Sequence, residues 1–100
     1  MKNLFKKIFG PPKVNLQELS ANGAIIIDVR TPGEFKSGHV ERSVNIPLDQ
    51  ISSGIKKLKN KEQVIITCCA SGMRSGAAKN ILKSQGYANV YNGGSWKNLI

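Results

Sequence analysis

Residues 63–75, QVIITCCASGMRS, decide the fold of this 100-residue chain. The stretch begins with an apolar, β-branched run, which is typical of a strand buried on both faces of a parallel sheet. It continues into a short polar loop that contains a glycine, and helical spacing follows. Cys69 therefore lies where a buried strand ends and a helix is about to begin.

Strand and helix signals alternate on either side of this stretch. Apolar runs predict further strands at 24–29, 43–46 and 89–92. Capping residues and helical spacing predict the helices between them, which begin near Asn15, at Thr31 and near Asp49, with a last one that buries Ala77, Ala78, Ile81 and Leu82. Parallel strands joined through helices need crossover connections, so we expect an α/β fold with helices on both faces of the sheet.

The loop after Cys69 has the composition of an anion-binding turn. Reactive groups of open parallel sheets lie at the carboxyl ends of the strands, where Cys69 falls. Successive backbone N–H groups and the start of the next helix can surround its sulfur, which favours a thiolate. Gly72 permits the tight turn, Arg74 supplies charge suited to an oxyanion, and Ser75 caps the helix or donates to the anion. We expect Cys69 to be a nucleophile.

The same loop, CASGMRS at 69–75, resembles the active-site loop of single-domain rhodaneses. Other stretches are similar to motifs of that family in the same order, and the similarity runs from about Val14 to Trp96. They are Asp28-Val29-Arg30, the stretch from Glu34-Phe35 through Gly38-His39-Val40 to Asn45-Ile46-Pro47, and the stretch Val90-Tyr91-Asn92-Gly93-Gly94 with Trp96. The resemblance implies a rhodanese-like three-layer fold with a parallel sheet of four or five strands flanked by helices.

The resemblance also implies an enzyme of the thiosulfate sulfurtransferase type, with a persulfide intermediate on Cys69. Sulfane sulfur would pass from a small anionic donor such as thiosulfate to a thiophilic acceptor such as cyanide or a thiol, including a protein thiol. No metal and no other cofactor are implied. The expected substrate-binding residues are the rest of the loop: Ala70, Ser71, Gly72, Met73, Arg74 and Ser75.

Residues outside the loop are expected to have mostly structural roles. We expect Asp28 and Arg30 to support the site by bracing the loop and by pairing with Glu34. His39 is the only histidine, but sulfur transfer from a preformed thiolate needs no separate base. We therefore interpret His39 as a hydrogen-bonded structural residue.

Other functions compete with sulfur transfer. Phosphatases and arsenate reductases also use a cysteine thiolate in a backbone cup closed by an arginine, but their signature has five intervening residues, whereas four separate Cys69 from Arg74. A non-catalytic rhodanese-like binding module is a second alternative, although such modules commonly lack the cysteine. A Cys68–Cys69 redox pair is disfavoured because neighbouring strand residues point to opposite faces.

Two departures from the family pattern leave the acceptor open. Arg42-Ser43 stands where the family has Gly-Ala, and the spacing between Gly94 and Trp96 is shorter than in the family. Neither departure falls in the Cys69 loop.

The amino-acid composition limits the classes of partner and the cellular location that we expect. A net charge of +9 permits an anionic partner, but the lysines lie singly or in pairs beside apolar residues, which favours solvated helix faces over a nucleic-acid patch. Two adjacent cysteines do not form a disulfide framework, and no apolar run approaches the ~20 residues of a membrane span. We expect a cytoplasmic location and a monomeric domain over residues 14–100.

Residues 1–13 form a separate segment in the sequence. Apolar residues at helical spacing alternate with lysines, and Gly10-Pro11-Pro12 stops any helix. We interpret residues 1–13 as a basic amphipathic N-terminal extension that packs on the domain or makes weak peripheral contact with an anionic membrane.

Overall fold

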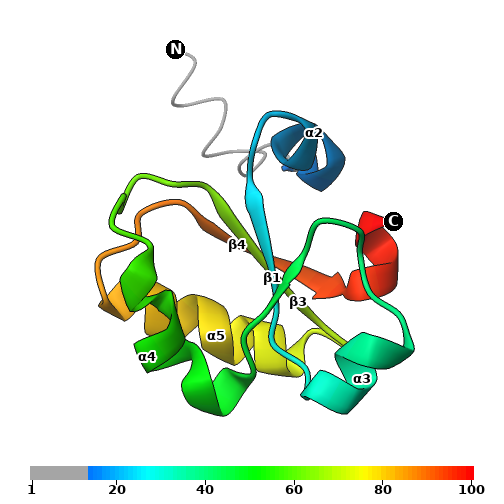
Figure 1. Ribbon diagram of the computed structural model, residues 1–100. Helices are drawn as coiled ribbons and strands as arrows, with labels where there is room; N and C mark the ends of the chain where they lie inside the picture. Colours follow the sequence, from blue (N-terminus) through cyan, green and yellow to red (C-terminus); the bar gives the residue numbers. More distant parts are fainter. Residues whose placement is uncertain (1–13) are drawn as a thin grey trace, which may run out of the picture.

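The computed structural model describes residues 14–100, which form a four-stranded parallel sheet with helices on both faces (Figure 1). The sheet has the order β2-β1-β3-β4, with every neighbouring pair parallel. The strands are β1 (Ile25–Asp28), β2 (Val44–Asn45), β3 (Ile65–Cys69) and β4 (Val90–Ser95). The helices are α2 (Leu16–Ala21), α3 (Pro32–Ser37), α4 (Ile51–Gly54) and α5 (Met73–Ser84), with 3₁₀ turns η1 (Leu48–Gln50), η2 (Ile55–Lys57) and η3 (Trp96–Leu99). The predicted α/β architecture is confirmed.

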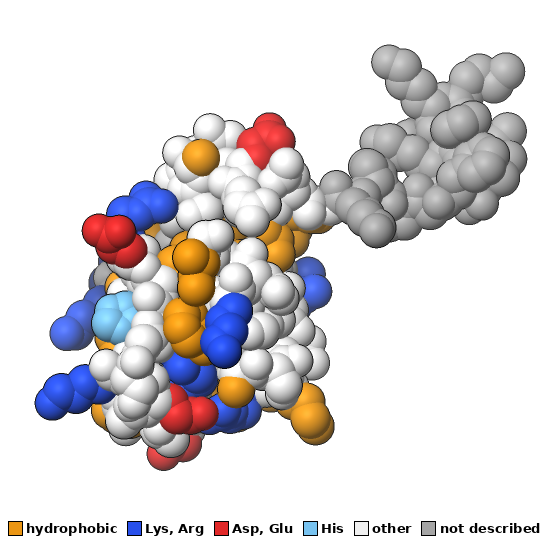
Figure 2. Space-filling model, turned by 90° about the vertical axis from the view of Figure 1, so that its right-hand side faces the viewer, with side chains coloured by type: hydrophobic (Ala, Val, Ile, Leu, Met, Phe, Trp, Pro, Cys, Tyr) orange, Lys and Arg blue, Asp and Glu red, His pale blue; other side chains and the backbone are white. Residues whose placement is uncertain are grey.

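The predicted extension over residues 1–13 lies outside the described residues. Within residues 14–100, no helix has the length and apolar character needed to cross a membrane. On the face shown in Figure 2, lysine and arginine side chains are interspersed with acidic and hydrophobic ones.

Each face of the sheet has its own hydrophobic cluster. The first lies under α4, η2 and α5, and consists of Ile27, Val29, Ile51, Ile55, Ile65, Cys69, Ala78, Leu82, Tyr87 and Val90. The second consists of Ile26, Val40, Ile66, Cys68 and Leu99, with Leu16, Leu19, Ala24 and Trp96 packed against it from α2, η3 and the start of β1. Burial of both faces explains why the central strands are almost entirely apolar.

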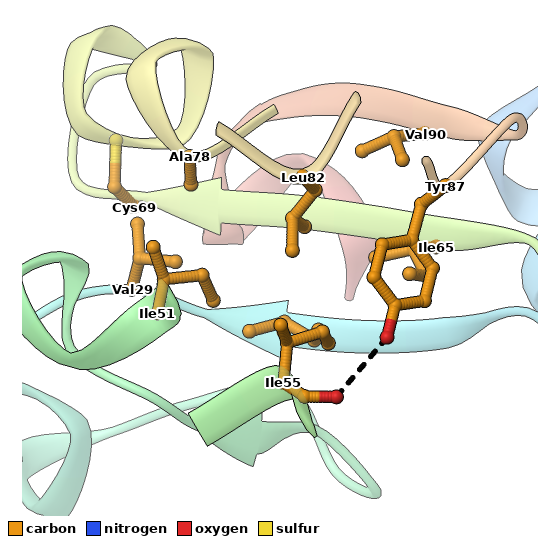
Figure 3. Close-up of a cluster of buried hydrophobic side chains, with 10 residues drawn as sticks. Val29, Ile51, Ile55, Ile65, Cys69, Ala78, Leu82, Tyr87 and Val90 are labelled. Carbon is orange, nitrogen blue, oxygen red and sulfur yellow. Dashed lines mark hydrogen bonds between the residues drawn. The ribbon is translucent and has the colours of Figure 1, made fainter. Parts of the chain in front are cut away.

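Figure 3 shows the two ends of the first cluster. Tyr87 closes one end, where its hydroxyl donates a hydrogen bond to the Ile55 carbonyl oxygen at 3.1 Å. Cys69 lies at the other end, beside Val29 and Ile51. Because β3 ends at Cys69, this cysteine lies at the carboxyl edge of the sheet, directly before the loop that leads into α5.

The structure corrects two details of the helix prediction. Asp49 caps no helix: it lies inside η1, and the predicted helix is a succession of η1, α4 and η2. The sequence of α4, ISSG, is rich in poor helix formers, which explains the short pieces. In α5 the prediction for Ala77 is wrong, because Ala77 is exposed and Ser75 is buried in the same stripe as Ala78 and Leu82.

Candidate active site

The sulfur of Cys69 lies inside the loop that follows β3. The side chain is buried, and the Gly72 backbone N–H donates to Sγ at 2.9 Å. Gly72 has a φ of 104°, a left-handed conformation that favours glycine and turns the chain back over the sulfur. The Ser75 hydroxyl lies 3.3 Å from Sγ on the first turn of α5.

This environment lowers the pKa of the Cys69 thiol. Burial is the largest single influence and acts to raise the pKa, because a thiolate loses its hydration. The Ser75 hydroxyl and the backbone N–H groups of Ser75, Gly72 and Ser71 all act in the opposite direction, and together they outweigh burial. The loop therefore stabilises a negative charge at a position from which water is excluded.

Cys68 is chemically different from its neighbour. Its side chain points to the opposite face of β3 and belongs to the second cluster. Burial raises the pKa of this thiol to about 12, and the Asp28 carboxylate adds to the effect. Cys68 is therefore a neutral core residue, and the two sulfurs face different layers of the fold.

Asn92 is a neighbour of the loop that the sequence did not single out as a site residue. Its Oδ1 accepts hydrogen bonds from the Ser75 hydroxyl at 2.6 Å and from the Gly94 N–H at 2.9 Å. Its Nδ2 donates to the Gly72 carbonyl oxygen at 3.1 Å. Asn92 thus ties the loop to β4. The sequence showed Asn92 as part of the stretch Val90-Tyr91-Asn92-Gly93-Gly94, but nothing in that stretch indicated contact with the Cys69 loop.

Arg74 lies at the rim of the loop, half-exposed, in an ion pair with Glu34. The guanidinium Nη1 and Nη2 lie 2.6 and 3.0 Å from the two carboxylate oxygens. The pair lowers the pKa of Glu34 to about 2, with the Arg74 hydrogen bonds as the main cause and the Thr31 backbone N–H as the next. The contact fixes α5 against α3, and the predicted role of Arg74 in binding an oxyanion stays a prediction.

Asp28 and Arg30 form a second, fully buried ion pair. The Arg30 Nε donates to both carboxylate oxygens of Asp28 at 2.9 and 3.0 Å, and its Nη2 lies 2.6 Å from Oδ2. The guanidinium also donates to the carbonyl oxygens of Glu34 and Gly38, and it lies 4.8 Å from the centre of the Trp96 ring. The expected pairing of Arg30 with the Glu34 carboxylate is wrong, because Arg74 takes that carboxylate. Arg30 braces α3 instead.

The remaining loop residues present their side chains to solvent. Ala70 and Ser71 are exposed, and Met73 is 83% exposed. A cleft of about 380 Å³ is lined by Val29, Thr31, Pro47, Leu48, Asp49 and Arg74, and of the loop residues only Arg74 borders it.

His39 makes the kind of contact expected of a structural residue. Its Nδ1 lies 2.7 Å from the Phe35 carbonyl oxygen, which can only accept, so Nδ1 carries the proton. The ring also stacks on the Phe35 ring, with 3.7 Å between the centroids. The contact joins the end of α3 to the chain that leads into β2.

The structure thus defines an α/β protein with a cysteine at the carboxyl end of a parallel strand, where main-chain N–H groups favour the anionic form of its sulfur. The chain belongs to the rhodanese-like domain family, whose model matches residues 12–98. The predicted family is thereby confirmed.

Individual relatives agree with this assignment. The chain is 36% identical over 74 residues to the thiosulfate sulfurtransferase PspE of Escherichia coli, an alignment that covers 73% of this chain and 71% of PspE. Among solved structures, a rhodanese with anions from E. coli has a TM-score of 0.70 at 34% identity, covering 75% of this chain and 89% of that one. A human single-domain sulfurtransferase has a TM-score of 0.74 at 25% identity, covering 89% and 95% of the two chains. The predicted class of activity, sulfur transfer, is confirmed.

Proposed function

We propose that the Cys69 thiolate takes the outer, sulfane sulfur of thiosulfate or a similar donor and passes it to a thiophilic acceptor. In the first step the thiolate attacks that sulfur, a new S–S bond forms on Cys69, and sulfite leaves with the electron pair of the broken S–S bond. In the second step cyanide or a thiolate attacks the outer sulfur of the persulfide. Thiocyanate or a new persulfide leaves, and the Cys69 thiolate is regenerated.

The observation that carries this proposal is the 2.9 Å hydrogen bond from the Gly72 N–H to Cys69 Sγ, inside a loop whose N–H groups lower the pKa of that thiol. A thiolate is the form that attacks sulfane sulfur. The persulfide that results is also an anion, and the same ring of donors suits its terminal sulfur. The same N–H donors therefore suit both the Cys69 thiolate and the Cys69 persulfide.

The ion pair at the rim argues against the phosphatase alternative. In such a mechanism an arginine must turn its donors toward the tetrahedral anion. Here two donors of Arg74 are held by Glu34, and only four residues separate Arg74 from Cys69. The retained, activated cysteine likewise favours catalysis over a binding module.

Mass spectrometry after treatment with thiosulfate tests the proposal. We expect the protein to gain about 32 Da on Cys69, the mass of one sulfur atom, and to lose it when cyanide is added. Cys69→Ser should gain nothing, while Cys68→Ser, the matched control, should still gain one sulfur. Absence of the adduct in the native chain would refute sulfur transfer by Cys69, and its loss in Cys68→Ser would point to a dithiol mechanism.

Several expectations about partners stay predictions from the sequence. A cytoplasmic location, a monomeric state and weak membrane contact through residues 1–13 follow from composition and spacing alone. Co-sedimentation with anionic liposomes, comparing the full chain with a chain that begins at Val14, tests the last of these. Equal binding by the two chains would end the membrane hypothesis.

A further inference from the structure

The Ser75 hydroxyl lies between the sulfur of Cys69 and the amide oxygen of Asn92. Ser75 is fully buried, with its Oγ 3.3 Å from Cys69 Sγ and 2.6 Å from Asn92 Oδ1. A serine hydroxyl has a single proton to donate. It can therefore donate to the sulfur or to the amide, but not to both at once.

The orientation of the Asn92 amide is fixed by its other partners. Oδ1 accepts from the Gly94 N–H, and Nδ2 donates to the Gly72 carbonyl oxygen. A flipped amide would set two donors against each other at Gly94 and two acceptors against each other at Gly72. The carbonyl end of Asn92 is consequently the end that faces Ser75.

We propose that Asn92 is a positioning residue of this active site, which holds the Ser75 proton while the sulfur of Cys69 is uncharged and releases it when that sulfur is a thiolate. The proposal rests on the proposed function, in which Cys69 alternates between these forms. It assigns a role to β4 that goes beyond support of the sheet.

The hydrogen bonds available in each form support this role. In the thiol form the Cys69 S–H can donate to Ser75 Oγ while the hydroxyl donates to Asn92, so both bonds are made. In the thiolate form the hydroxyl turns to Sγ, and Asn92 Oδ1 keeps only the Gly94 N–H. In the persulfide form the charge moves to the outer sulfur, Sγ becomes a weak acceptor, and the hydroxyl can return to Asn92. Asn92 therefore stabilises the persulfide form of Cys69 relative to the thiolate form.

Other ionisable groups near Cys69 do not interfere with a test of this idea. Arg74 in α5 interacts with Cys69 electrostatically, and its charge is balanced by the ion pair with Glu34. Cys68 adjoins Cys69 on β3, and with a pKa of about 12 it stays neutral over the range of interest. Substitution of Asn92 changes none of these groups.

The test is a double-mutant cycle on the rate of Cys69 alkylation by iodoacetamide as a function of pH. Asn92→Leu removes the acceptor without adding charge, and Asn92 is exposed, so the fold should tolerate the change. With Ser75 present, we expect the midpoint of the profile to fall by about half to one pH unit, because the hydroxyl is left free for the thiolate. Asn92→Leu also removes the hydrogen bonds of Asn92 to Gly72 and Gly94, and that effect is present in both backgrounds. In a Ser75→Ala background only that effect remains, so the midpoint should fall less than it does with Ser75 present. The control is Asn80→Leu, the same change at an exposed position of α5, which should not move it.

An unchanged or raised midpoint in Asn92→Leu, or the same shift with and without Ser75, would overturn the proposal. If Asn92→Leu fails to fold, Asn92→Asp takes its place in the cycle. A carboxylate competes more strongly for the Ser75 proton, so Asn92→Asp should raise the midpoint more in the native background than in the Ser75→Ala background. An equal rise in both backgrounds would mean that charge repulsion alone acts on Cys69, and it would overturn the proposal. The readout needs no sulfur donor, so failure here is distinguishable from failure of sulfur transfer.

Discussion

Glu34 in α3 and Arg74 in α5, 40 residues apart in sequence, form a two-pronged ion pair at the rim of the Cys69 loop, with N–O distances of 2.6 and 3.0 Å. Glu34 also accepts from the Thr31 N–H at 3.0 Å, so one carboxylate both caps α3 and holds α5. The pair therefore neutralises the charge of an arginine at the rim of the loop whose sulfur is proposed to meet an anionic donor.

We predict that Glu34→Gln lowers the KM for thiosulfate by about threefold at low salt, because the Arg74 charge is then uncompensated and the donor is a dianion. Glutamine still serves as the capping partner of Thr31, so α3 should stay intact. Steady-state kinetics over a range of ionic strength provide the measurement. Arg74→Gln should move KM the opposite way. A Glu34→Gln enzyme with unchanged KM and reduced kcat would show that the pair positions the loop rather than masking a charge.

The same ion pair should make the stability of the protein depend on pH in the acidic range. The folded-state pKa of Glu34 is about 2, below its ordinary value of 4.5, so the stabilisation from ionised Glu34 is fully present above about pH 4.5. It is lost as the pH falls through 2, where the carboxylate is protonated in the folded state as well. We therefore expect the melting temperatures of the native chain and Glu34→Gln to differ above pH 4.5 and to converge toward pH 2. A difference that stays constant over this range would exclude the ionised pair as its source.

The buried pair of Asp28 and Arg30 should matter to stability rather than to charge at the site. Both side chains are buried, so removing one partner leaves an uncompensated charge in the core, which typically costs about 3–5 kcal/mol. We predict a loss of this size for Arg30→Met in urea unfolding, with the carbonyl contacts to Glu34 and Gly38 lost as well. Lys36→Met, a change at an exposed position of α3, is the control and should be nearly neutral. A loss below about 1 kcal/mol in Arg30→Met would mean that water or another group replaces the guanidinium.

Local signals explain why much of the fold was predictable from the sequence. The Thr31 and Glu34 capping box, with Pro32 at the first helical position, begins α3 as predicted, because each contact lies within one turn. The apolar runs that became β1 and β3 carry their own burial pattern. In contrast, helical spacing alone does not reveal which stripe of α5 faces the sheet. Ser75, predicted as a loop residue that caps the helix or donates to the anion, is buried against Thr67 and Cys69, whereas Ala77 is exposed.

The site was predictable only where it is contiguous in sequence. Cys69 and Gly72 lie in one loop, and their chemistry follows from the strand, turn and helix around them. The partners of that loop come from elsewhere: Glu34 from α3 and Asn92 from β4. An ion pair of Glu34 was expected from the sequence, but with Arg30 as the wrong partner, and the strand-end position of Asn92 gave no indication of its contact with Ser75. Such contacts depend on which elements the strand order β2-β1-β3-β4 brings together.

Arg42 stands where the motif that the sequence resembles has glycine, and its backbone has a conformation that glycine favours. Its φ is 72°, in the left-handed region, and it is the only residue other than glycine with a positive φ among residues 14–100. A side chain in this region costs roughly 1–2 kcal/mol, whereas glycine adopts it without steric penalty. The side chain gains little in return, since its one hydrogen bond is a 3.5 Å contact with Ser20 at an exposed position.

We therefore predict that Arg42→Gly stabilises the protein by about 1 kcal/mol, because the relief of strain exceeds the entropy that glycine adds to the unfolded chain. Urea unfolding monitored by circular dichroism measures the change. Arg42→Ala is the matched control: it removes the same charge and the Ser20 contact but keeps the Cβ, so it should not stabilise. Equal stabilisation by Ala and Gly would trace the effect to the lost charge on a chain of net charge +9 rather than to the backbone. A less stable Arg42→Gly would mean that the arginine side chain contributes more than its single contact indicates.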